Sequence, residues 1–337
     1  MITVDLEQII EFVVYSFLNI SLVICISPFF MTLIKKTKAY TQKRRGPPLM
    51  QGYYNILKLM KKETIYSSNS SFVMRFTPVI NLAVMIIASL SIPLLFLPQV
   101  SDSFGNIVLF LYLLAIGKFF LALSGLDAAS TFGGMGSSRE MTVLAVFEPI
   151  ILVVLGAIAF VFNSFDFYVI FEKSLICSGS YFSSLELTSS CSQLFILIIP
   201  ISMSLFVILI VEIARIPVDN PETHLELTMI HEAMILEQTG PNLAMLEISH
   251  GMKQTLLMGI LINIFFPIGL GIGGSIIGIV VGLGFFLVKA TILAIIVGIF
   301  ESSIAKFRLL RLPSLFTIAF FLPIISIAVV VFLPLQI

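Results

Sequence analysis

The sequence has no tryptophan and few charges: only 11% of its 337 residues are Asp, Glu, Lys or Arg, while 58% are hydrophobic. A soluble protein carries roughly 25% charged residues. So little charge cannot cover a soluble surface of this size, which excludes a cytosolic enzyme and a disordered chain. The 19 basic residues are balanced by 19 acidic ones, so the basic surplus of a nucleic-acid binder is also missing. A membrane protein with several spans remains.

Cysteine is also scarce, with three residues and no C-x-x-C pair. Zinc sites and iron–sulfur clusters need several closely spaced thiolates, so we expect no metal, cofactor or redox centre in this chain. Cys177 and Cys191 fall in the same Ser-rich connection, residues 163–192. A disulfide between them and two unpaired thiols are both compatible with the sequence.

Eight apolar runs are long enough to cross a hydrocarbon core of roughly 30 Å as helices. The sequence therefore predicts an all-α membrane protein that forms a single multi-pass domain over residues 1–337. Acidic residues precede the first run in place of the basic residues of a signal peptide, so we expect this run to be retained. The predicted spans are residues 9–34, 76–98, 106–126, 143–162, 193–213, 254–273, 276–300 and 314–335.

The loop charges predict the orientation. Ten Lys and Arg residues lie in the segment 35–75, which marks that side as cytoplasmic. Alternating through eight spans then places sixteen of the nineteen basic residues on the same side. We therefore expect both termini to lie outside, in a cell membrane of the cytoplasmic or inner type.

The first cytoplasmic loop begins with Arg44 and Arg45 and continues into a stretch that ends near Lys62. Apolar residues in this stretch recur at helical spacing, which predicts an amphipathic surface helix after the first span. Such a helix would lie in the membrane interface with its lysines toward the lipid headgroups. A basic loop that only sets the topology is the alternative.

The second cytoplasmic loop, residues 127–142, contains Asp127, three glycines, Arg139 and Glu140. Glycine permits tight turns and close backbone approach. No Gly-Lys-Ser/Thr follows, so the loop is not a Walker A phosphate-binding loop. Taken alone, its composition predicts a flexible connection.

The third cytoplasmic loop, residues 214–252, holds all three histidines, and together with Glu212 it accounts for seven of the nineteen acidic residues. Leu, Ile and Met residues interrupt the acids, so this long acidic loop is expected to pack against membrane or protein. Carboxylates in such a setting have a raised pKa and exchange protons near neutral pH. His231 and Glu232 begin like the zinc-protease motif H-E-x-x-H, but Ile235 stands where the second histidine would be.

Three charged residues fall inside predicted spans, where each charge costs on the order of 2.5–3.5 kcal/mol. Lys118 and Glu148 lie at comparable depths and are expected to pair, while Lys289 has no evident partner. Glu212 and Glu301 close their spans and would reach the interface by snorkelling or join a buried ionisable chain. The glycines at 274, 278 and 282 predict close helix packing.

The cytoplasmic loops resemble those of complex I subunit 1, the helical membrane subunit at the foot of the peripheral arm in NADH-quinone oxidoreductase. The resemblance rests on three motifs in the family's order: Arg45-Gly-Pro with the helix that ends at Glu63, the glycine-rich loop with Arg139 followed by Glu148, and the run from Glu212 to Gly240. Val218 and His224 depart from the complex I pattern. The segments around Arg139-Glu140 and Phe147-Glu148-Pro149 are more similar to the membrane subunits of energy-converting NiFe hydrogenases, including formate hydrogenlyase.

The resemblance implies a membrane-anchor and coupling subunit of a respiratory-type hydrogenase complex. A peripheral arm would dock on the cytoplasmic side, with the NiFe centre in its large subunit and iron–sulfur clusters in its small subunit. Antiporter-like membrane subunits would move H⁺ or Na⁺. The residues implied in proton transfer are Glu148, Lys118, Glu212, Glu226, Glu237, Asp127 and Lys289. Those implied in docking and coupling are Arg44, Arg45, Arg139, Glu140, Arg215, Asp219, Glu222, His224, His231 and Glu232.

Two other functions stay open. A quinone-binding subunit of a complex I-type NADH dehydrogenase shares the same motifs. A stand-alone secondary transporter shares the membrane spans, although the alternation of acids with Leu, Ile and Met suits a protein interface better than a gate.

Overall fold

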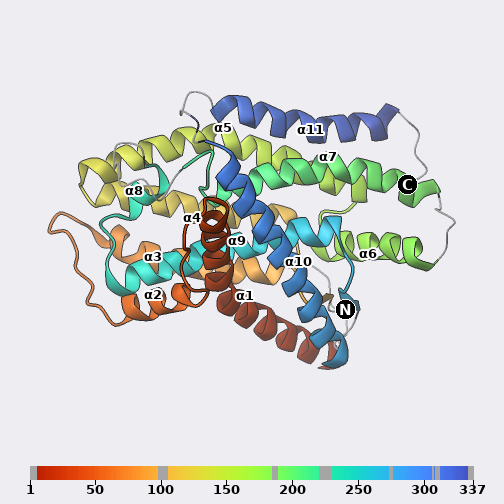
Figure 1. Ribbon diagram of the computed structural model, residues 1–337, viewed down its shortest axis with the longest axis horizontal. Helices are drawn as coiled ribbons and strands as arrows, with labels where there is room; N and C mark the ends of the chain where they lie inside the picture. The colour runs from red at the N-terminus through yellow and green to blue at the C-terminus, as the bar shows by residue number, and fades with distance from the viewer. Residues whose placement is uncertain are drawn as a thin grey trace.

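The computed structural model describes residues 6–97, 105–183, 189–219, 229–272, 276–305, 307 and 312–332. Within these ranges the chain is a bundle of eleven helices with two very short strands (Figure 1). The first six helices are α1 (Leu6–Thr41), α2 (Gln51–Met60), α3 (Phe72–Ser91), α4 (Ile107–Asp127), α5 (Thr131–Phe162) and α6 (Phe167–Ser183). The others are α7 (Ser189–Glu212), α8 (His231–Ile235), α9 (Gly240–Phe265), α10 (Ile276–Ser303) and α11 (Leu312–Phe332).

Helix α9 runs through the middle of the bundle. It contacts α1, α2, α3, α6, α7 and α10, and most of its described side chains are buried. On one side, α5, α7 and α11 lie along the long axis of the molecule and pack against one another (Figure 1). On the other side, α1 and α10 contact each other and run diagonally to this group.

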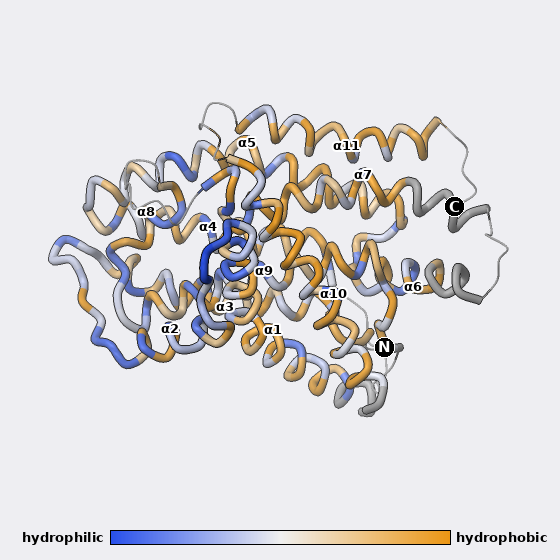
Figure 2. Tube along the Cα trace, in the orientation of Figure 1, coloured by the Kyte–Doolittle hydropathy of each residue, from blue (hydrophilic) through white to orange (hydrophobic). Residues whose placement is uncertain are grey.

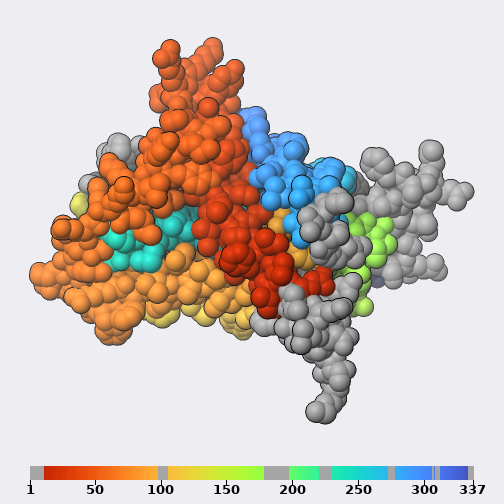
Figure 3. Space-filling model, turned by 90° about the horizontal axis from the view of Figure 1, so that it is seen from below, coloured from red at the N-terminus to blue at the C-terminus, as the bar shows by residue number. Residues whose placement is uncertain are grey.

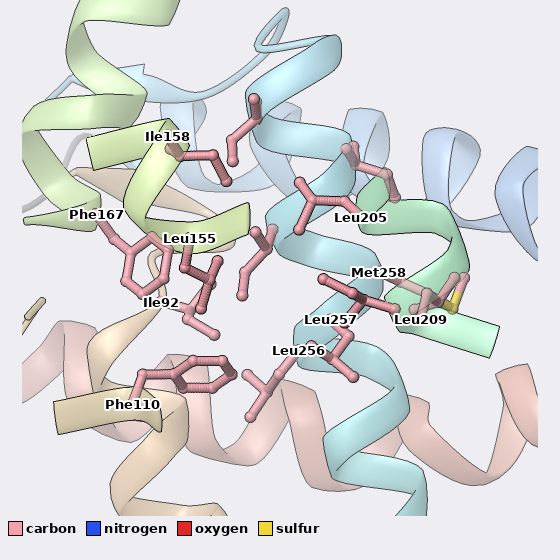
Figure 4. Packing of buried hydrophobic residues seen from close by; sticks show 14 of the residues in the cluster. Ile92, Phe110, Leu155, Ile158, Phe167, Leu205, Leu209, Leu256, Leu257 and Met258 are labelled. Atoms are coloured by element: carbon pink, nitrogen blue, oxygen red, sulfur yellow. The ribbon is translucent and has the colours of Figure 1, made fainter. Parts of the chain in front are cut away.

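Large apolar side chains from five helices meet beside α9 (Figure 4). Phe110 of α4, Leu155 of α5, Phe167 of α6 and Leu205 of α7 pack around Leu256 of α9 in one contiguous cluster. Close packing of this kind is what holds helices together in lipid, where hydrophobic transfer from water no longer drives their association.

Six helices of the described chain are long and apolar enough to cross a membrane: α1, α3, α4, α5, α10 and α11, the first counted from Glu11 and α10 from Gly278. They coincide with six of the eight predicted spans. The other two predictions, 193–213 and 254–273, fall on α7 and α9, which are long helices inside the bundle but are not among the six. The count of eight spans stays a prediction.

Hydrophilic residues gather at the end of the bundle that carries α2, α8 and the chain from 61 to 71, which we call the polar end (Figure 2). The start of α1 and the end of α11 lie toward the opposite end, together with α6 (Figure 1). An even number of crossings brings both ends of a chain to one side. Which side of the membrane this is stays a prediction.

The predicted amphipathic helix is present as α2, two residues shorter than expected. Its Gly52 lies against α1 so closely that a Cβ atom would stand 2.6 Å from the carbonyl oxygen of Pro28. The hydroxyl of Tyr53 donates a hydrogen bond to the carbonyl of Cys25 in α1. Helix α2 is therefore attached to the bundle, although none of its own residues is buried.

Three predicted loops are largely helical, which corrects the sequence analysis. The flexible connection expected over 127–142 is wrong, because α5 begins at Thr131, where the Ser130 hydroxyl accepts a hydrogen bond from the Gly133 amide. The outer connection 163–192 contains α6, and α9 begins at Gly240, well before residue 254. Hydropathy detects only the part of a helix that is apolar enough for lipid, so polar extensions of helices escape it.

A two-stranded parallel pair joins β1 (Phe96–Leu97) to β2 (Gly271–Ile272), with Phe96 opposite Gly271. At Gly282 of α10 a Cβ atom would stand 2.6 Å from the carbonyl oxygen of Leu95. The close packing expected of the glycine stripe is confirmed at Gly282, but its neighbour is the extended chain before β1. Gly274 lies outside the described residues.

Of the cysteines, Cys25 is free and exposed, and Cys177 is disulfide-bonded. The side chain of Cys191 lies outside the described part of the chain.

Candidate functional site

A cavity of about 260 Å³ lies at the polar end between α1, α2, α3, α4, α5, α8 and α9. In Figure 3 a teal strip from the α8–α9 region is visible between the orange residues of α2 and its neighbours and the lighter orange of α4. Apolar side chains form much of the wall: Pro28, Met31, Ile56, Met85, Leu114, Leu121, Met234, Ile235 and Leu246. The charged and titratable lining residues are Lys35, Lys118, Glu140, His231, Glu232, Glu247, His250 and Lys253.

The glycines of the second loop bring the cavity wall together. A Cβ atom on Gly136 of α5 would stand 2.7 Å from the Cβ of Ala233 in α8, and one on Gly133 would stand 2.5 Å from the carbonyl oxygen of Gly125 in α4. Only glycine permits such close backbone approach. The glycine-rich segment that resembled a flexible loop is therefore the part of α5 that packs against α4 and α8.

Glu212 is the centre of a buried ion cluster beside the cavity. Its carboxylate pairs with Lys118 of α4 through Oε1 and with Lys253 of α9 through Oε2, the latter at 3.4 Å. Glu212 is only 3% exposed. A buried carboxylate stays charged when cations this close compensate the loss of water. We call Lys118, Glu212 and Lys253 the central cluster.

The central cluster continues into the wall of the cavity. Lys118 and Lys253 line the cavity together with Glu140 of α5. A second cavity of about 10 Å³ lies next to it, lined by Lys118, Glu140, Glu212 and Asp219 among others. This is roughly the space that the centre of one water molecule needs. The arrangement places ionisable groups on both sides of a water-sized gap, so a proton has a short path between Glu140 and Glu212.

Glu301, at the end of α10, forms a second buried cluster. Its Oε1 accepts a hydrogen bond of 3.1 Å from Lys38 of α1, and its Oε2 lies 3.6 Å from Arg215. All three side chains are buried. Neither Glu212 nor Glu301 snorkels to the interface, because each has cationic partners from other helices within the fold.

The described ends of the acidic loop are held by two backbone contacts. The Asp219 carboxylate accepts hydrogen bonds from the amides of Ile230 and His231, at 2.9 and 3.1 Å. The Arg139 guanidinium donates to the carbonyl of Met229 at 3.2 Å. These bonds bring α8 back against the end of α7. Glu222, His224 and Glu226 lie outside the described residues.

The imidazole rings of His231 and His250 lie side by side in the cavity wall, with centroids 5.2 Å apart. Burial, together with the nearby Lys253, lowers the pKa of His231 to about 4. Burial also raises the pKa of Glu232, against the effect of Lys35. Burial thus disfavours the charged form of both side chains.

The predicted pairing of Lys118 with Glu148 is wrong. Lys118 pairs with Glu212, and the Glu148 side chain is exposed on the outer face of α5. The expected depth of Glu148 was counted from a span that begins at residue 143, whereas α5 begins at Thr131, so Glu140 and not Glu148 lies beside Lys118 at the cavity. The direction in which a helical side chain points matters as well. Glu148 follows the fully buried Phe147 and therefore points away from the bundle.

Two further residues of the implied proton path have local structural partners. Lys289 of α10 donates hydrogen bonds to the carbonyls of Phe266 and Ile268, both at 2.8 Å, just beyond the end of α9. Asp127 accepts from the amides of Ser71 and Met74, at 2.9 and 3.0 Å, and so caps the start of α3. Their contacts are those of helix-end caps.

The residues implied in docking divide into two groups. Arg44 and Arg45 are exposed, as is Glu237 of the implied proton path. Arg215 and Asp219 are 4% and 1% exposed. Direct contact of these two with a partner is excluded by their burial, and their contacts instead hold the acidic loop.

Sequence reasoning missed Lys253, whose place at the edge of a predicted span suggested only a topology signal. Glu247, His250 and Lys253 recur every three residues in α9 and all line the cavity. This spacing places them on one face of a helix, and it was the signal that could have identified them. It was hidden because residues 240–253 were assigned to a loop.

A bundle of apolar helices with charged clusters buried between them defines an integral membrane protein. The sequence matches the family described as NADH dehydrogenase over residues 13–333. The chain belongs to this family, that of NADH dehydrogenase subunit 1, as the loop motifs predict.

Similar proteins come from hydrogenase and complex I systems. The chain is 26% identical to hydrogenase-4 component C of Escherichia coli, with 88% of this chain and 89% of that protein covered. It is 27% identical to formate hydrogenlyase subunit 4 of the same organism, with 88% and 92% covered. NADH-ubiquinone oxidoreductase chain 1 of Petunia hybrida is 28% identical, over 59% of this chain and 58% of that protein.

The fold has a counterpart among solved structures. A chain of the membrane-bound sulfane sulfur reductase, an archaeal respiratory membrane complex, superimposes with a TM-score of 0.73 at 20% identity. The alignment covers 94% of this chain and 99% of that chain. The hydrogenase and complex I relatives are membrane subunits of oxidoreductase complexes.

Proposed function

We propose that this chain is the membrane-anchor and coupling subunit of an energy-converting hydrogenase complex. The observation that carries the proposal is the continuity between the cavity and the central cluster, in which Glu140, Lys118 and Lys253 line the cavity and Glu212 lies behind them. Charges at such short range in a medium of low dielectric constant interact strongly. A change of charge in the cavity therefore alters the protonation of groups inside the bundle.

The polar end is the docking side in this proposal. Exposed Arg44 and Arg45 and the acidic loop would receive a peripheral arm with a NiFe-bearing large subunit and an iron–sulfur small subunit. These partners hold the redox centres. Reduction of protons in the arm changes the charge next to the loop, and the loop is bound through Asp219 and Arg139 to the cavity wall.

Ion transfer continues outward along α5. Glu148 lies eight residues beyond Glu140, about 12 Å along the helix, and is exposed toward the surroundings of the bundle. An exposed carboxylate inside a span is costly in lipid. An antiporter-like membrane subunit that covers Glu148 would remove this cost. A change in the protonation of Glu148 would then reach that subunit and drive its transport of H⁺ or Na⁺.

The hydrogenase relatives favour this function over its main alternative, since they match 88% of the chain and the complex I relatives 57–66%. The decisive experiment is purification of the intact complex through a tag on this chain. Co-purification of a NiFe protein, with hydrogen evolution that does not depend on quinone, supports the proposal. Inhibitor-sensitive quinone reduction without a NiFe protein would overturn it.

One observation favours a quinone-binding subunit of a complex I-type enzyme as the second candidate. The cavity combines an apolar wall with histidine and lysine side chains, which suits a ring with two carbonyl oxygens on an apolar tail. Quinone-dependent activity that is lost in His231→Ala, while the complex stays assembled, would establish it. A stand-alone transporter predicts ion transport by this chain alone in liposomes, and we expect none.

A further inference from the structure

The root of the acidic loop, residues 212–219, is bound to three different parts of the bundle. Glu212 binds α4 and α9, Asp219 binds the start of α8, and Arg215 faces Glu301 at the end of α10. The first two contacts belong to the cavity wall already described. The third connects the loop to helices that lie on the other side of α9.

Glu301 lies one turn beyond a close contact between α1 and α10. At Gly298, one turn earlier in α10, a Cβ atom would stand 2.2 Å from the hydroxyl oxygen of Thr37 in α1. Lys38, the next residue of α1, binds Glu301 Oε1, so the carboxylate is attached to the crossing itself. Its other oxygen is left to face Arg215. One side chain thus joins α1, α10 and the loop root.

The loop root is organised around Arg215. The carbonyl of Arg215 accepts hydrogen bonds from the amides of Val218 and Asp219, at 2.9 and 3.2 Å. The amide of Phe307, beyond α10, donates to the carbonyl of Pro217 at 3.0 Å. A shift of Arg215 would therefore move Asp219, and with it the start of α8, which carries His231 of the cavity wall.

We propose that Glu301 is a positioning residue that seats the acidic loop on the crossing of α1 and α10. Its effect on docking of the peripheral arm rests on the proposed function, whereas the seating itself does not. Breaking a buried ion pair on one side leaves an uncompensated charge, so Glu301→Gln should release Arg215 and let the loop root open. In the unmodified chain, the intact tie makes a motion of α1 against α10 a motion of the loop root.

The test measures how often the loop opens in membranes that contain the assembled complex. Met229 is 7% exposed and lies next to the tie between Asp219 and Ile230. A Met229→Cys reporter in a Cys25→Ser background is labelled with a small thiol reagent, because Cys177 is disulfide-bonded. We expect labelling on the order of ten-fold faster with Glu301→Gln. Glu172→Gln, an exposed carboxylate on α6, is the matched control and should leave the rate unchanged.

The variant Arg215→Gln must give the same increase, because it breaks the loop side of the tie and leaves Lys38 on Glu301. The double variant should label no faster than either single one, since both remove one contact. If the Glu301→Gln protein does not accumulate in membranes, the labelling rate of Arg215→Gln alone tests the proposal. Labelling at the control rate in either variant overturns the proposal.

Retention of the peripheral arm on blue-native gels separates the seating of the loop by Glu301 from the docking of the arm. Faster labelling together with loss of the arm supports both the seating by Glu301 and the docking function. Faster labelling with the arm fully retained supports the seating and contradicts docking through the acidic loop.

Discussion

Lys118 and Lys253, from α4 and α9, share the two carboxylate oxygens of Glu212, which lies 94 positions after Lys118 in the sequence. The pairing makes one acid the meeting point of three helices. It also places two cations next to Glu140 in the cavity wall. The charge state of this small group is therefore set jointly by the cavity and by the membrane part of the bundle.

Removing the shared acid should destabilise the fold. Glu212→Gln leaves two buried lysines without their counter-charge, which costs about 3–5 kcal/mol when one partner of a buried pair is lost. We expect a lower thermal midpoint of the purified complex and less of it in membranes. The triple variant Lys118→Met, Glu212→Leu, Lys253→Met replaces all the charges with apolar groups and should be more stable than Glu212→Gln. Equal stability of Glu212→Gln and the unmodified chain would contradict the buried cluster.

Glu148→Gln should abolish ion translocation and leave assembly intact. The side chain is exposed on α5, so its replacement removes no packing within this chain. Ion uptake by proteoliposomes that hold the complex is the measurement, with the amount of complex on native gels as the check on assembly. Glu172→Gln, at the other end of the bundle, is the matched control. Unchanged ion uptake in Glu148→Gln would remove this residue from the path.

Asp127 should act on stability and not on coupling. Its carboxylate caps α3 through the amides of Ser71 and Met74, and loss of such a cap costs about 1 kcal/mol. We expect Asp127→Ala to lower the thermal midpoint slightly and to keep the ratio of ions moved per electron. A reduced ratio at normal stability would instead return Asp127 to the proton path.

His231 should make stability depend on pH below neutrality. Its pKa is lowered by burial to about 4, from an ordinary value of 6.5. Between these values the unfolded chain binds a proton that the folded chain does not, so stability is highest above pH 6.5 and falls as the pH drops toward 4. The charged or titratable groups around it are Asp219, Glu212, Lys118, Lys253 and His250.

The variant His231→Asn removes this titration. Thermal midpoints measured from pH 7 to pH 5 should fall less in the variant than in the unmodified chain. Parallel curves would show that His231 is charged in the folded protein.

The sequence alone predicted the apolar helices well, because a segment that must satisfy its backbone in lipid needs little more than apolar composition and length. It failed on residues 131–142, where glycine disfavours helix and only packing of Gly136 against α8 makes the helix stable. It also failed on the start of α9, because charged and polar residues such as Glu247 and His250 are typical of loops. In the structure they lie on a helix face that lines the cavity.

Ion pairing could not be derived from depth. Counting from the predicted span ends gives Lys118 and Glu148 a similar depth, but α5 begins at Thr131 and brings Glu140 to Lys118 instead. Partners also depend on how each helix is rotated about its axis. The neighbours of Glu148 are informative here, because Phe147 is buried and the helix turns by about 100° per residue. The burial of Arg215 and Asp219 was likewise unpredictable, since their partners, Glu301 and the amides of α8, come from distant parts of the chain.

Helix α5 is one continuous element from Thr131 to Phe162, about 48 Å long. Its first part carries Glu140 and packs against α8 at the cavity. Pro149 lies inside it, directly after Glu148, and removes one backbone hydrogen bond at that turn. The turn of α5 with the missing hydrogen bond therefore lies beside the exposed acid Glu148. The part of the helix at the cavity and the part beyond Pro149 are joined where Glu148 faces outward from the bundle.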